Sequence, residues 1–201
     1  MANLNAPKGF VPSRYLSGAG WTGAVNMYYI PSTDSNIYSP GDAVKSVALS
    51  DSVGTMGIVK AAGTDVIRGV IVGFLAAPLF GQSFQGVPLD LTIQNIPAIK
   101  TKAYYALVVD DPNVLFEVQD DGLAALTATS VNKNAIFTVA NPTAPAQNSA
   151  SVLSTSSVST TNTLNLKIMG LIQRDDNTFG ANAKWLVKFN LHELLGGTSG
   201  V

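Results

Sequence analysis

The chain has 201 residues and a mass of 20.9 kDa, which suits one domain, or one domain with an extended arm. Charged residues make up 12% of it, against about 25% in a typical soluble domain, and 12 basic side chains nearly balance 13 acidic ones. A net charge of −1 gives no attraction for a nucleic-acid backbone. The lack of cysteine excludes disulfides, thiolate metal sites and a cysteine nucleophile. So few charges suggest a surface that other protein covers.

The N-terminal residues 1–23 show no hydrophobic period and are rich in Asn, Pro, Gly and Ser. We expect an extended N-terminal arm there and a single β-rich domain over residues 24–201. The first ten residues lack the apolar core of a signal peptide. Glycines, prolines and glutamines interrupt the uncharged stretch Gly69–Leu89, which argues against a membrane-spanning helix. We interpret Val70–Leu75 as a buried strand followed by a loop, and we expect no membrane partner.

Short β-branched or alternating runs recur along the rest of the chain and predict strands. Between two of them, Asp110–Asn113 has the composition of a turn, which favours a hairpin. Gly122–Ala128 is interpreted as one short helix with an Asp cap. The pattern predicts an all-β fold, a β-barrel or β-sandwich of jelly-roll or β-tulip type with an extended N-terminal arm. The predicted strands are Val25–Ile30, Ala43–Leu49, Met56–Lys60, Val66–Leu75, Ala103–Val109, Val114–Gln119, Ile136–Ala140, Leu164–Ile168 and Trp185–Leu191.

One segment interrupts this regularity. From Gly122 to Leu166 the only charged residue is Lys133, and Asn141–Thr163 consists largely of Ser, Thr, Ala, Asn and Pro. Such a tract is either a solvated, flexible loop or a long excursion ordered against a neighbouring subunit.

Patterns typical of catalytic or nucleotide sites are weak. Gly18–Gly23 matches the three-glycine dinucleotide pattern, but no strand precedes it and a β-like run follows, so we interpret its glycines as points where the arm bends. His192 is the only histidine and ends a predicted strand beside Glu193, where packing or a strand-ending hydrogen bond explains it. We therefore expect no enzyme activity and no cofactor.

Three acidic pairs are the remaining candidates for chemistry, Asp110-Asp111, Asp120-Asp121 and Asp175-Asp176. Adjacent residues of a strand face opposite sides, so none of the pairs is arranged as a two-carboxylate active site. None has the alternating oxygen ligands of a calcium loop. Turn chemistry at strand ends explains all three, and we expect no metal.

Several stretches together resemble the capsid cement proteins of tailed bacteriophages, also called head decoration or stabilising proteins. The C-terminal stretch is the most specific of them, and the resemblance covers both ends and the middle of the chain. The stretches are Asn3–Pro12 with Leu16–Gly18, Tyr28–Ile30, Asp110–Gln119, Leu166–Leu171, Asp176-Asn177 and Gly180–His192.

The resemblance implies a virion structural protein without enzyme activity. It would bind the outer surface of the major capsid protein shell and stabilise the expanded head by clamping neighbouring capsomers. It would be made in the host cytoplasm and sit on the phage head as a homo-trimer or homo-dimer, with the trimer favoured. Two other classes stay open: a minor head-completion or tail structural protein, and a receptor-binding module.

The expected contact residues come from the arm and from the two charge-poor stretches, because uncharged surfaces avoid the cost of burying ions. An arm with little structure of its own can also add backbone hydrogen bonds to a sheet edge. The residues expected to contact the capsid or another subunit are Asn3, Leu4, Asn5, Pro7, Phe10, Val11, Pro12, Tyr15, Leu79, Phe80, Phe84, Val152 and Leu153.

Overall fold

The computed structural model describes residues 3–75, 93–144 and 146–195 and is nearly all β. Two short 3-10 turns, η1 (Ala128–Ser130) and η2 (Thr155–Ser157), are the helical elements of the described residues. The strands are β1 (Val11–Tyr15), β2 (Asn26–Ile30), β3 (Ala43–Ser50), β4 (Met56–Lys60), β5 (Gly69–Leu75), β6 (Tyr104–Val109), β7 (Val114–Gln119), β8 (Asn134–Ala135), β9 (Phe137–Thr138), β10 (Val152–Leu153), β11 (Leu166–Leu171) and β12 (Lys184–Phe189).

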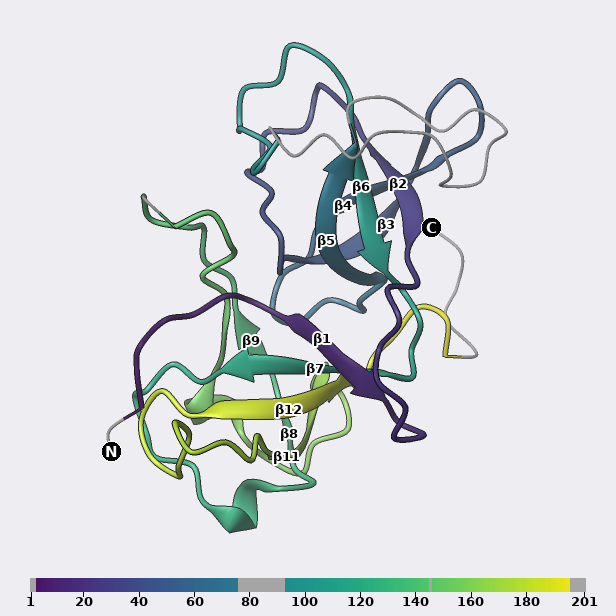
Figure 1. The fold of residues 1–201 in the computed structure, drawn as a ribbon. Helices are drawn as coiled ribbons and strands as arrows, with labels where there is room; N and C mark the ends of the chain where they lie inside the picture. Colours follow the sequence, from purple (N-terminus) through teal and green to yellow (C-terminus); the bar gives the residue numbers. More distant parts are fainter. Residues whose placement is uncertain (1–2, 76–92, 145, 196–201) are drawn as a thin grey trace.

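Five strands close into a small barrel in the order β2-β4-β3-β5-β6 (Figure 1, upper part). All its pairings are antiparallel except β2 with β4, where Tyr29 lies opposite Gly57. β-Branched and aromatic side chains fill the interior, as expected for half-buried pleated strands. The buried residues of this cluster are Tyr28, Ile30, Tyr38, Val44, Ile58, Ile71, Phe74, Ile96, Ala106 and Val108.

A five-stranded sheet in the order β1-β7-β12-β11-β8 lies beside the barrel, with the pair β9–β10 next to it (Figure 1, lower part). Its buried cluster includes Trp185, Phe116 and Phe189 from the sheet and Ile67 and Val70 from the barrel side. Barrel and sheet therefore share packed side chains. The prediction of an all-β fold built from barrel or sandwich strands is confirmed.

Most predicted strands are found close to their expected positions. Met56–Lys60 is found with the same bounds, and Trp185, Val187 and Phe189 are fully or nearly fully buried, as the alternation predicts. Among the described residues, no helix is long and apolar enough to cross a membrane.

The predicted hairpin is wrong. β6 pairs with β2 and β5 in the barrel, whereas β7 pairs with β1 and β12 in the sheet. The residues between them do form a turn, in which Val114 N–H donates to Asp111 O at 3.1 Å. This turn connects the barrel to the sheet. β6 and β7 each bury their apolar side chains against other strands, so they do not pair with each other.

Two further expectations are corrected. Residues 122–127 form no helix: 122–124 are a bend, and 125–127 are irregular. The Asp120 and Asp121 carboxylates accept the backbone N–H groups of Gly122 and Leu123 instead. Within 141–163, the middle part packs on its own chain: β10 pairs with β9, and Ser149, Ser151 and Leu153 are buried, whereas residues 146–148 and 160–163 are exposed. Hydroxyl side chains satisfy buried backbone groups there, which explains the Ser/Thr content.

Candidate interaction surface

Polar side chains hold the first residues of the chain against the sheet. Asn3 donates from Nδ2 to the carbonyl oxygens of Thr178 and Ala181 at 2.9 and 3.0 Å, and its Oδ1 accepts Thr178 N–H at 2.9 Å. Gln119 on β7 accepts Ala6 N–H through Oε1 and donates from Nε2 to Asn5 Oδ1, both at 2.9 Å. The predicted arm is thus fixed to its own domain. Residues 3–15 are called the N-terminal segment below.

Phe10 anchors the N-terminal segment in the core. It is 1% exposed, and its ring packs edge-on against Phe137 with the ring centroids 5.2 Å apart. Phe116 and Phe189 complete the aromatic cluster. Phe10 was expected to contact another chain. That expectation is wrong for this conformation, because the side chain is buried in the core of its own chain. An apolar residue in a Pro- and Gly-rich stretch gives no sequence period that would mark it as buried.

After Phe10 the segment becomes the edge strand of the sheet. Val11 lies opposite Glu117 and Tyr15 opposite Val114, with a bulge between Pro12 and Arg14. The outer side of β1 is partly closed by residues 19–21, since Trp21 N–H donates to Ser13 O. Gly18 and Gly23 have φ of +94° and +88°, so the interpretation of these glycines as bends is confirmed.

Large apolar side chains stay exposed along this part of the chain: Leu4 is 71% exposed, Val11 40% and Leu16 48%. Asn5 is also exposed, whereas Asn3, Pro7, Pro12 and Tyr15 are half-buried. Apolar residues that face solvent singly are ordinary, but here they follow one segment that is held in place by side-chain hydrogen bonds. The arm therefore presents a fixed, partly apolar surface.

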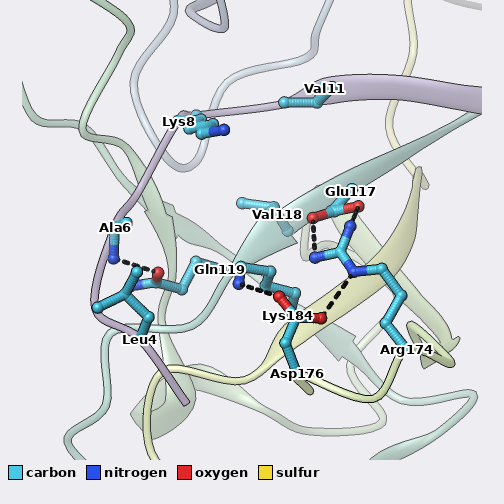
Figure 2. A pocket seen from close by; sticks show the side chains of 11 residues that line it. Leu4, Ala6, Lys8, Val11, Glu117, Val118, Gln119, Arg174, Asp176 and Lys184 are labelled. Atoms are coloured by element: carbon cyan, nitrogen blue, oxygen red, sulfur yellow. Dashed lines mark hydrogen bonds and ion pairs between the residues drawn. The ribbon is translucent and has the colours of Figure 1, made fainter. Parts of the chain in front are cut away.

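A groove of about 470 Å³ lies between the N-terminal segment and strands β7 and β12 (Figure 2). Leu4, Ala6 and Val11 face it from the segment, and Val118 and Gln119 face it from the sheet. The remaining lining residues are Lys8, Gly9, Glu117, Arg174, Asp176 and Lys184.

Charges at one end of the groove are paired with each other. Arg174 forms two parallel hydrogen bonds with Glu117, Nη1 to Oε2 and Nη2 to Oε1, each at 3.0 Å. Its Nε donates to Asp176 Oδ1 at 3.1 Å, and Lys184 Nζ lies 3.7 Å from Asp176 Oδ2 (Figure 2). Partial burial lowers the pKa of the Arg174 guanidinium. The carboxylates of Glu117 and Asp176 raise it by more, so the pKa lies above its ordinary value. The network presents little net charge to a partner.

The other expected contact residues divide into three groups. Val152 is half-buried, and Leu153, the second residue of β10, is fully buried, so the expectation that Leu153 contacts another chain is wrong in this conformation. Leu79, Phe80 and Phe84 lie outside the described residues.

The candidates for chemistry have structural roles, but turn chemistry alone does not explain Asp110 and Asp120, which also accept hydrogen bonds from distant strands. His192 is 3% exposed and its Nδ1 accepts Leu194 N–H at 3.1 Å, which confirms the predicted strand-ending hydrogen bond. Burial, helped by the Arg68 cation, lowers the pKa of His192 to about 4, so the ring is neutral near pH 7. Asp111 accepts Asn113 N–H within its turn, as expected of turn chemistry.

A buried polar cluster joins barrel and sheet and was not foreseen from sequence. Arg68 donates from Nε to Tyr28 Oη at 2.8 Å and lies 3.5 Å from Asp110 Oδ2. Glu193 accepts both the Ser46 N–H and the Ser46 hydroxyl. Burial first, and then the hydrogen bond to Asp110, raises the pKa of Tyr28 well above its ordinary value. No local pattern signals the cluster, because its members are dispersed along most of the chain.

Comparisons of the chain with protein-family models, with curated proteins and with solved structures give no match.

Proposed function

We propose that the protein is a virion structural protein that binds the outer surface of a phage's major capsid protein shell and stabilises the expanded head by clamping neighbouring capsomers. The observation that carries the proposal is the N-terminal segment, which is fixed to the sheet yet exposes Leu4 and Val11 beside a groove. The resemblance of the same stretch to phage cement proteins supplies the partner.

The surface chemistry suits such a partner. A segment that is already ordered loses little conformational entropy when a second chain covers it. The groove presents apolar side chains from Leu4, Ala6 and Val11, and four of its five charged residues pair with each other. An extended segment of capsid protein that leaves Lys8 in solvent can therefore cover it without burying an unpaired ion. Many copies on one lattice add avidity, so each contact need not be strong.

The test is binding of the purified chain to expanded heads that lack it, prepared from the phage that encodes it. Val11→Asp and Leu4→Asp each place a charge on the proposed contact and should lower head binding at least tenfold. Leu49→Asp is the matched control, because Leu49 is 45% exposed on barrel strand β3 and lies away from the groove. Equal binding by all three variants would contradict the proposal.

Two further readouts separate the competing functions. A cement protein should be present in hundreds of copies per head, in proportion to the capsid protein, whereas a head-completion protein would be present in about a dozen. Attachment should also survive high salt, because few charges face the groove unpaired. Release by moderate salt alone would contradict an apolar contact.

A further inference from the structure

Three side chains that can react with one another meet where the barrel adjoins the Ser/Thr-rich excursion. Lys60, the last residue of β4, places Nζ 2.8 Å from Oδ1 of Asn141 and 2.8 Å from Oδ2 of Asp42. Nζ also donates to the Ile37 carbonyl oxygen at 2.9 Å. The amine nitrogen of Lys60 is therefore within hydrogen-bond reach of both a carboxamide and a carboxyl group.

The surroundings exclude water from two of the three groups. The Lys60 side chain is 8% exposed and that of Asp42 is fully buried. Asp42 Oδ2 also accepts Ser39 N–H, whereas its Oδ1 is buried and accepts no hydrogen bond from the described residues. Burial raises the pKa of the Asp42 carboxyl, and the Lys60 ammonium offsets this only in part. Burial therefore makes the charged form of the Asp42 carboxyl less favourable than it is in water.

The carboxamide carbon of Asn141 is close enough to be attacked. It is bonded to Oδ1 at about 1.23 Å, so it lies within about 4 Å of Lys60 Nζ. That is near the separation at which positioned groups react. We propose that Lys60 and Asn141 form an intramolecular isopeptide bond, Nζ to Cγ, with release of ammonia and with Asp42 as the proton-transfer group.

The step balances without any other reactant. Asp42 takes a proton from the Lys60 ammonium, and the free amine attacks Cγ of Asn141 to give a tetrahedral intermediate. The acid form of Asp42 donates a hydrogen bond toward the developing oxyanion. The nitrogen of the intermediate then loses its proton through Asp42 to the departing NH₂ group. The C–N bond to that group breaks, and the released ammonia takes up the proton that Asp42 first removed from Lys60, so it leaves as ammonium and Asp42 returns to its carboxylate form.

The sequence around Asn141 favours this outcome over ordinary loss of the side-chain amide. Asparagine usually loses its amide when the next residue's backbone nitrogen attacks Cγ, but the next residue is Pro142, which has no N–H. Asn141 itself is exposed, so the released ammonia has a path to solvent. The side-chain amide of Asn141 therefore remains available for attack by Lys60.

Such a bond would join β4 of the barrel to the start of the excursion that packs on the sheet side. It would close a loop of about eighty residues, and cross-links of long loops stabilise mainly by restricting the unfolded chain. This inference does not depend on the proposed function.

Intact-mass spectrometry of the folded full chain tests it. We expect a mass below that of the Lys60→Arg variant by one ammonia, after correction for the substitution, and a protease digest in which the peptides holding Lys60 and Asn141 stay joined. Arginine keeps a cation beside Asp42 and cannot form the bond. Asn141→Ala, at an exposed position, should also have its full sequence mass.

Lys45→Arg is the matched control, because Lys45 pairs with the carboxylate of Asp65 at 2.9 Å and contacts no side-chain amide among the described residues. This variant should keep the deficit. Full sequence mass in folded wild-type protein after prolonged incubation would overturn the proposal. So would an ammonia deficit that persists in Lys60→Arg, since the amide would then have been lost elsewhere.

Discussion

Trp185 donates a 3.0 Å hydrogen bond from Nε1 to Oδ2 of Asp120, and both residues are fully buried. The other carboxylate oxygen, Oδ1, accepts Gly122 N–H at 3.0 Å. Asp120 thus uses both oxygens as acceptors, one for the largest core side chain and one for the turn that follows β7.

Asp120→Asn should therefore destabilise the protein by about 1–3 kcal/mol, because an amide offers one acceptor oxygen and leaves one buried donor unpaired. Asp111→Asn is the control, since Asp111 accepts only Asn113 N–H in its turn, and asparagine suits that position. Urea unfolding followed by tryptophan fluorescence measures both. Equal midpoints would show that the buried acceptor pair contributes little.

Phe10→Ala should cost about 3–5 kcal/mol, as expected when a buried phenylalanine is truncated among packed rings. It should also increase amide exchange in β1, because the ring anchors that strand to the core. Hydrogen exchange with mass detection separates this local effect from global unfolding. The exposed neighbour in the segment, Leu4→Ala, should change stability by less than about 0.5 kcal/mol.

Gly41→Ala should destabilise far more than Gly54→Ala. Both glycines have φ near +90°, which costs an alanine roughly 1–2 kcal/mol at either position. A Cβ at Gly41 would also collide with the backbone carbonyl of Lys8, whereas nothing lies within 4 Å at Gly54. Thermal unfolding of the two variants isolates this contact. Matching melting temperatures would mean that the N-terminal segment moves aside without loss.

Stability should fall between pH 6.5 and pH 4 through His192. Its pKa is 6.5 when unfolded and about 4 when folded, so the unfolded chain takes up the proton first as the pH falls. The loss is roughly 3 kcal/mol and is complete below the folded pKa. His192→Asn keeps an acceptor for Leu194 N–H without titrating, so its curve should be flatter in this window. Parallel curves would rule out His192 as the source.

Strand positions were largely predictable because burial leaves a period of two in the sequence. Trp185, Val187 and Phe189 show it, and Met56–Lys60 is marked by the β-branched pair Ile58 and Val59. Which strands pair was not predictable in the same way. A turn at Asp110–Asn113 has the same composition whether it joins neighbouring strands of one sheet or connects the barrel to the sheet. Only long-range packing determines which strands pair on either side of it.

The proposed interaction surface lies on the segment where the sequence placed the expected contacts, and only some of the expected residues are exposed there. Composition identified the segment that holds Leu4 and Val11, yet it could not separate them from Phe10, because neither burial nor exposure is periodic in an irregular chain. The sequence also did not reveal the Arg68 cluster or the Lys60 site, for a related reason. Their partners come from residues far apart in sequence, such as Asp110 and Asn141.

The hydrogen bonds from Asn3 to Thr178 span 175 residues, and β1 meets its partner β7 only after about a hundred residues have intervened. On the ribosome, the N-terminal segment therefore emerges well before the residues on which it docks. The barrel, whose five strands lie between residues 26 and 109, has all its own pairings available much earlier. We expect the barrel to form first. The N-terminal segment should stay without its hydrogen-bond partners until the strands of the sheet have formed.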